Sequence, residues 1–183
     1  MSVPVRAVDP SFFAREKLRR NYRPTRVELL FVGESPPTSG RFFYQSDSGL
    51  YRAIRDTFVS AFPNLDGSNF LESFRDLGCY LVDLCEVAVD KLTPRQRQAA
   101  CAHGESRLSD LLVELRPRII VTVVLSIVEN VHRAQTAANW EGTHLALPYP
   151  GRWRHHQRAF QTELLPLLQS ELQQNWPSSR AQS

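Results

Sequence analysis

The stretch "LFVGESPPTSGRFFYQSDSGLYRAI", Leu30 to Ile54, decides the fold. It begins with a compact apolar run that ends in glycine, which is typical of a buried strand. A proline-stiffened turn (GESPP, Gly33 to Pro37) and a Phe-Phe-Tyr cluster at 42–44 follow. From Leu50 onward, apolar residues recur four apart, the pattern of one face of a helix. The order strand, rigid turn, helix indicates an α/β fold.

The rest of the chain repeats this alternation. Each predicted strand is a continuous apolar run, which favours a parallel sheet covered on both faces. We therefore expect a three-layer α/β/α domain over residues 1–183, with a central four-stranded parallel sheet, a basic helical segment at 1–26 and a frayed tail at 176–183. Helices are predicted over 11–22, 49–62, 68–77, 93–115 (with a break near Gly104), 126–137 and 155–172, and strands over 27–33, 79–84, 117–124 and 144–150.

Composition narrows the class of protein. Of 183 residues, 42% are hydrophobic and 22% charged, an ordinary globular balance. The chain has no apolar run long enough to cross a membrane and no signal-peptide core in "MSVPVRAVDP", so we expect a cytoplasmic protein. A monomer is expected.

The cysteines and glycines argue against cofactors. The three cysteines form no CxxC pair, which argues against a disulfide framework, a zinc site and an iron–sulfur cluster. Cys79 and Cys85 are expected to be buried thiols. No phosphate-binding or dinucleotide-binding glycine pattern is found among the 8 glycines. We expect neither a metal nor a cofactor.

Two basic clusters stand out although the net charge is only +3. Seven Lys or Arg face two acids between Arg6 and Arg26, and the segment "GRWRHHQR" at 151–158 places three Arg and two His around a Trp. Such clusters can follow the phosphates of a nucleic acid. The alternative for each is a solvated surface.

The expected topology also predicts where a ligand binds. In parallel α/β sheets, ligands lie beyond the carboxyl ends of the strands. Four loops follow the predicted strands there, at 34–44, 83–86, 125–127 and 149–154.

At these loops the chain resembles the uracil-DNA glycosylase superfamily, most closely its thermophile-type branch. The resemblance runs from Val27 to Leu172 in the same order of motifs. It implies an enzyme that hydrolyses the N-glycosidic bond of a flipped, damaged or deaminated DNA base. The family's Gly-Glu-Ala-Pro-Gly, Gly-Arg-Pro-Phe-Val, base-reading Asn, Arg-Pro-x-Ile-Ile-Val and His-Pro-Ser segments match residues 33–37, 40–44, Asp83, 116–121 and 149–151.

The resemblance implies roles for the residues around the base. Phe43 would stack on the flipped base, whereas Phe42 is expected in the core; the alternative places Phe43 in the core as well. Gly33 and Pro36 would shape the pocket. Asp83 would read the base edge.

Asp83 departs from the family's Asn, and its chemistry differs. An ionised carboxylate only accepts hydrogen bonds, so it suits a base with an amino donor, such as cytosine, better than uracil. The alternative is that Asp83 caps the next turn or pairs with an arginine. Base specificity therefore stays open.

Catalytic roles are implied in the same way. Glu34 is the preferred acid for positioning water, and Ser35 stands where other branches carry Asp or Asn. Asp47 is a weaker candidate and is expected to cap the helix beginning near Gly49. Tyr149 replaces the family's His and would donate one hydrogen bond to the departing base; alternatively it packs in its loop.

The last loop would contact DNA. Trp153 falls at the position of the family's wedge residue, which fills the space left by a flipped nucleotide; the alternative is a Trp docked on the surface. His155 and His156 are expected at an exposed helix start; the alternative is that they bend back into the pocket. The residues expected to hold the DNA are Gly151, Arg152, Trp153, Arg154 and Arg158.

Two other functions compete with this one. Gly33-Glu34-Ser35 hints at a serine nucleophile, but the residue that would supply the oxyanion-hole N–H is Pro36, which has none. The second alternative stays open: a nucleic-acid-binding protein on the same fold that no longer cuts. Ser35, Asp83 and Tyr149 have all changed from the family pattern, as loss of activity would also allow.

Overall fold

The computed structural model describes residues 10–151 and 153–172. Its strands form one parallel sheet in the order β2-β1-β3-β4. The strands are β1 (Leu29–Gly33), β2 (Cys79–Asp83), β3 (Ile119–Thr122) and β4 (Thr143–Ala146), and the α-helices are α1 (Pro10–Asn21), α2 (Gly49–Ala61), α3 (Phe70–Asp76), α4 (Pro94–Leu115), α5 (Val128–Ala137) and α6 (Arg154–Leu172). The predicted α/β fold with a four-stranded parallel sheet is confirmed.

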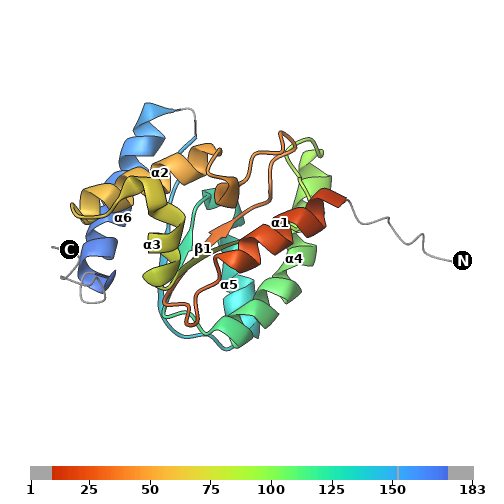
Figure 1. Cartoon of the computed structure of the whole chain (residues 1–183). Coiled ribbons are helices and arrows are strands. Elements are labelled where there is room, and N and C mark those ends of the chain that lie inside the picture. The colour runs from red at the N-terminus through yellow and green to blue at the C-terminus, as the bar shows by residue number, and fades with distance from the viewer. Residues whose placement is uncertain (1–9, 152, 173–183) are drawn as a thin grey trace, which may run out of the picture.

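Helices cover both faces of the sheet (Figure 1). Helices α2, α3 and α6 lie on one side, and α4 and α5 lie on the other. All residues of β1, β2 and β3 are buried, whereas β4, at one edge of the sheet, is partly exposed. The continuous apolar runs that predicted buried strands are explained by this double cover.

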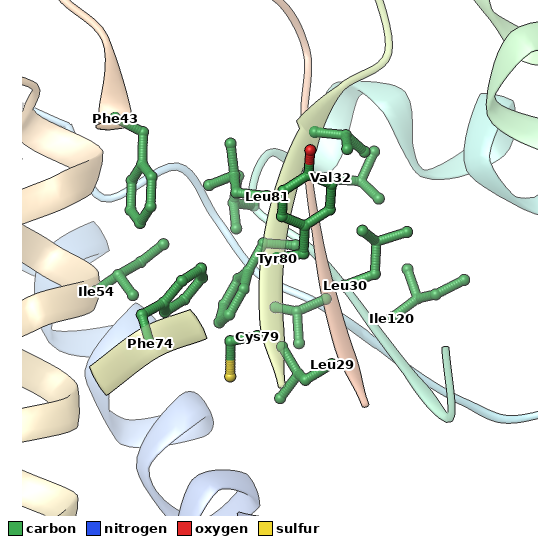
Figure 2. Packing of buried hydrophobic residues seen from close by; sticks show 14 of the residues in the cluster. Leu29, Leu30, Val32, Phe43, Ile54, Phe74, Cys79, Tyr80, Leu81 and Ile120 are labelled. Carbon is green, nitrogen blue, oxygen red and sulfur yellow. The ribbon is translucent and has the colours of Figure 1, made fainter. Parts of the chain in front are cut away.

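The core between the sheet and α2 and α3 is aromatic. Figure 2 shows Phe43, Ile54 and Phe74 on the side of the sheet that α2 and α3 cover, near Leu81 of β2. Phe43 comes from the short 3₁₀-helix η1 (Phe43–Gln45). Strand pairing places Leu81 beside Phe31, which lies within ring-contact distance of Phe74, with centroids 5.6 Å apart.

The residue that caps the start of α2 differs from the expected one. Ser48, not Asp47, caps α2, because its hydroxyl accepts from the N–H of Tyr51. Asp47 instead accepts a hydrogen bond from the N–H of Phe42 at 2.8 Å. The predicted start of α4 is confirmed: Thr93 forms a capping box and Pro94 occupies the first turn.

The expected break in α4 near Gly104 is wrong, because the helix runs unbroken to Leu115. Gly104 has a packing role instead. A Cβ atom there would overlap the carbonyl oxygen of Leu84, at the end of β2. The glycine therefore lets α4 approach the strand end, which brings α4 to the candidate site.

Other expectations concern the cysteines and the chain ends. Cys79 and Cys85 are buried free thiols, as predicted, and so is Cys101. None of the described helices has the length and apolarity needed to span a membrane. The predicted tail at 176–183 and the first nine residues of the basic segment lie outside the described residues.

Candidate functional site

A cavity of about 320 Å³ opens at the carboxyl edge of the sheet. This volume lies at the lower end of the range of small-molecule sites, roughly 300–1,000 Å³. The loops after β1, β2 and β3, and the loop between β4 and α6, all contribute to its wall. The predicted site residues that line it are Gly33, Glu34, Ser35, Pro36, Phe43, Asp83 and Tyr149.

The third loop differs from the expectation. Val123 and Val124 line the cavity rather than residues 125–127, which form the 3₁₀-helix η3 (Leu125–Ile127) ahead of α5. The backbone of Val123 continues the sheet pairing by donating to Val32. The contribution of β3 is therefore an apolar wall.

Glu34 is held at the rim by Arg97 of α4. Arg97 Nε donates to Glu34 Oε1 at 2.6 Å, and a second guanidinium nitrogen pairs with Oε2. The Sγ of Cys101 lies 3.8 Å from Oε1. The hydrogen bonds that Arg97 donates to Glu34 raise the pKa of Arg97. Both oxygens of the preferred acid are thus engaged by one guanidinium in a bidentate pair.

Asp83 lies deeper, in a buried ion pair with Arg19 of α1. Arg19 Nη2 donates to Asp83 Oδ2 at 2.8 Å, and both residues are buried. Arg107 of α4 donates to the Asp83 carbonyl oxygen. Burial raises the pKa of the Asp83 carboxyl, and the charges of Arg19 and Arg107 act in the opposite direction. The predicted alternative of an arginine partner is confirmed, and Asp83 still lines the cavity.

Gly33 makes room for this carboxylate. A Cβ atom at Gly33 would lie 2.7 Å from Asp83 Oδ1. The two residues pair directly across β1 and β2. The glycine that ends the first strand is therefore required by the acid that ends the second.

Phe43 lines the cavity and also belongs to the core. It is only 3% exposed and packs edge-on against Tyr44 and Tyr51, with centroids 5.0 and 5.8 Å away. The expectation of a core position for Phe42 is confirmed, although Phe42 also touches the cavity. Both predicted roles of Phe43 are compatible with its position.

Ser35 and Asp90 form hydrogen bonds between the loops that follow β1 and β2. Ser35 Oγ accepts from the N–H of Val89 at 3.3 Å. Asp90 accepts from both the N–H and the hydroxyl of Thr38. These bonds tie the loop after β1 to the loop after β2, which keeps the cavity wall in place.

Tyr149 lies at the mouth of the cavity and is 46% exposed. Partial burial raises its pKa, and the nearby charge of Asp83 adds to the effect. The phenol therefore keeps its proton at neutral pH and can donate a hydrogen bond. This geometry is compatible with the donor role expected for it.

A larger groove of about 850 Å³ adjoins the cavity. Tyr149 and Arg41 line both, so the two spaces meet at these side chains. Arg52 and Gly151 line the groove as well. Sequence reasoning selected Gly151 for DNA contact but missed the two arginines.

Trp153, Arg154 and Arg158, which are also DNA-contact candidates, are not among the residues that line either space. Trp153 is 61% exposed, and Arg154 and Arg158 are exposed on the first turns of α6. His155 and His156 pack against each other at 4.2 Å between ring centroids. Arg152 lies outside the described residues.

The most important residues that the sequence did not single out are arginines. Arg19 belongs to the basic cluster that was expected to face phosphate or solvent; it is instead 6% exposed, because it compensates the charge of Asp83. Arg97 is 63 residues from Glu34 in the chain, and no local pattern links them. Only the packing of α1 and α4 against the strand ends brings them there.

The described residues contain no group of three or more His, Cys, Asp or Glu side chains arranged to hold a metal ion. No family model matches this chain, and the search of curated proteins gave no match.

Proposed function

We propose that the protein is a DNA glycosylase that hydrolyses the N-glycosidic bond of a base turned out of the nucleic-acid strand. The observation that supports this most is the meeting of Phe43, Asp83, Glu34 and Tyr149 around one cavity. An aromatic face, a polar group for the base edge, an acid and a hydroxyl donor are the parts this reaction uses.

Each part has a role in this scheme. The base enters the cavity and stacks on Phe43, with its edge toward Asp83. Tyr149, at the mouth, donates toward the oxygen of the departing base, where negative charge develops. Glu34, at the rim, positions water for the sugar when its pair with Arg97 opens. We propose further that the protein acts in the cytoplasm as a monomer, without metal or cofactor.

The adjoining groove suits the rest of the strand. Arg41 and Arg52 line it, and Trp153, Arg154 and Arg158 lie at the start of α6. Contacts of arginine with phosphates position a nucleic acid without selecting its sequence. A polymer rather than a free base is therefore the proposed substrate.

An excision assay tests the proposal. Labelled single strands and duplexes carrying uracil, cytosine, adenine, hypoxanthine, xanthine or a thymine mismatch are incubated with protein, and alkali then reveals abasic sites. We expect excision of at least one base. Phe43→Leu removes the aromatic face and should lower the activity roughly 10- to 100-fold, the range of one base stack.

The matched control is Phe74→Leu. Phe74 packs against Phe43 at 5.3 Å between centroids, but it is not among the residues that line the cavity. Equal losses in both variants would show that Phe43 matters only for the core. Absence of abasic sites on every substrate contradicts the enzyme.

A second candidate, a nucleic-acid-binding protein that does not cut, is favoured by one specific observation. Two of the three acids that line the cavity are already paired with arginines, Glu34 with Arg97 and Asp83 with Arg19. A protein of this kind would retard single-stranded DNA in a gel and lose this binding in Phe43→Leu, with no abasic product from any strand.

A further inference from the structure

Helix α1 supplies a side chain to the back of the cavity. Arg19 binds Asp83 Oδ2 at 2.8 Å and also pairs with Glu16 on its own helix. Its guanidinium lies over the ring of Phe42, 5.4 Å from the centroid. Arg19 is not among the residues that line the cavity. Arg19 therefore binds Asp83 without lining the cavity itself, and the residue of this pair that lines the cavity is Asp83.

The two oxygens of the Asp83 carboxylate have different neighbours. Oδ2 accepts from Arg19, while Oδ1 lies on the side of Gly33. Gly33 and Asp83 both line the cavity. An ionised carboxylate presents acceptors only, so a ligand that meets Oδ1 has to bring an N–H or O–H donor.

This inference rests on the proposed function, in which the ligand is a base. We propose that Asp83, positioned by Arg19, selects bases whose edge carries an exocyclic amino group, such as cytosine and adenine, over their oxo counterparts, uracil and hypoxanthine. The amino group donates to Oδ1. The oxo group of uracil or hypoxanthine points a lone pair at the same negative oxygen and is repelled.

The size of the preference follows from the kind of bond. A hydrogen bond to a charged group contributes more than a neutral one, and its loss leaves a buried oxygen without a partner. We expect the amino member of each pair to bind roughly 10- to 100-fold more tightly than its oxo counterpart.

Arg19 is a positioning residue in this scheme, and its charge decides whether Asp83 prefers amino bases or oxo bases. Without it, burial favours the protonated carboxyl, which donates a hydrogen bond as an amide does. The preference then moves toward the oxo bases. Among the described residues, the other charged and titratable groups that interact with Asp83 include Arg15 and Glu16 of α1, Arg107 of α4, Tyr44 of η1 and Tyr149.

A binding experiment tests the selection without requiring catalysis. The probes are short single strands of abasic residues that carry one 2′-fluoroarabino nucleotide with cytosine, uracil, adenine or hypoxanthine; the 2′-fluorine slows cleavage of the glycosidic bond. A fully abasic strand measures binding by the backbone alone. Affinities are compared within the cytosine–uracil and adenine–hypoxanthine pairs.

Three variants give the decisive comparison. Arg19→Lys keeps the positive charge and should keep the amino preference. Arg19→Met and Asp83→Asn should each abolish or reverse it, by different routes. Arg20→Met, on the exposed neighbouring position of the same helix, is the matched control and should change nothing. Circular dichroism identifies the temperature at which each variant is folded.

The outcomes separate the two proposals. Base-dependent binding with an equal or oxo-favouring preference in the native protein overturns the amino-group selection and leaves the nucleic-acid site standing. An amino preference that survives in Asp83→Asn also overturns it. Binding no tighter than that of the abasic strand overturns the proposed base site itself, and the selection with it.

Discussion

Two arginine–carboxylate pairs lie at the same edge of the sheet, and they differ in burial. In the Asp83–Arg19 pair, the side chains are 9% and 7% exposed. In the Glu34–Arg97 pair, they are 14% and 42% exposed. Each joins the end of a strand to a helix distant in the chain. The first pair is buried, and in the second pair the arginine is partly exposed to water.

This difference predicts different roles. A buried charge cannot lose its partner without a large penalty, so the Asp83–Arg19 pair is expected to be fixed. A partner in water can leave and be replaced by solvent at low cost, so the Glu34–Arg97 pair is expected to open. In the proposed glycosylase, the buried pair would therefore serve base recognition and the rim pair the chemical step.

The largest expected effect is on stability. Arg19→Met removes the partner of buried Asp83, whose carboxyl then has to take up a proton or stay charged without a partner, and should lower the free energy of unfolding by roughly 3–5 kcal/mol. Arg97→Met should lower it by no more than about 1 kcal/mol, because this pair is partly solvated. Urea unfolding followed by circular dichroism measures both. Equal losses would remove the distinction between the two pairs.

For the Glu34–Arg97 pair at the rim, we expect a large effect on activity and a small effect on stability. On a substrate that the native protein cleaves, Glu34→Gln should reduce single-turnover excision about 100-fold or more, because the amide cannot accept a proton from water. Its free energy of unfolding should change by less than about 1 kcal/mol. A variant that cuts at the native rate would exclude Glu34 from the chemistry and leave it as a loop anchor.

A smaller effect is expected outside the cavity, on the surface at the start of α6. The double variant Arg154→Ala, Arg158→Ala should flatten the slope of log K against log salt by about 1 for each phosphate that the protein no longer neutralises. The matched control is Arg26→Ala; this side chain is 81% exposed and precedes the amino end of β1, away from the cavity. If control and double variant match, the α6 arginines are solvated surface, as the alternative holds.

Another expected effect concerns His144, a partly buried group on β4, and complements the two pairs. Burial lowers the pKa of His144 to about 4 from 6.5, with a further contribution from His132. As pH falls below 6.5, His144 binds a proton in the unfolded chain, whereas in the folded protein it stays neutral until the pH approaches about 4. Stability therefore rises with pH between about 4 and 6.5. His144→Gln should flatten this part of the curve, measured by urea unfolding at several pH values; an unchanged curve would contradict it.

Local sequence patterns were sufficient for the strands and helices. The apolar run ending at Gly33 and the β-branched run before Val123 predict strands because double burial requires such residues. Thr93 and Pro94 predict the start of α4 by their hydrogen-bonding and backbone preferences. Two local predictions were wrong, the cap at Asp47 and the break at Gly104. In both, the residue serves a contact outside the helix: Asp47 accepts from the N–H of Phe42, and Gly104 leaves room for the carbonyl of Leu84.

The site was predictable in its strand-end residues and unpredictable in their partners. The carboxyl-edge rule brings Glu34, Asp83 and Tyr149 together once the strand order is parallel. Nothing local distinguishes Arg19 from Arg20, yet one is buried against Asp83 and the other is exposed. The helix face that turns toward the sheet depends on how α1 packs.

The sequence by itself determined the alternation of strands and helices and the edge at which a ligand would bind, because hydrophobic period and turn chemistry act over a few residues. Only the tertiary structure decided which charges meet. Arg19 and Asp83 are 64 residues apart, and their pairing depends on the burial that makes an unpaired carboxylate costly. Burial is a property of the packed molecule, so the ionic state of the cavity could not be predicted from its residues alone.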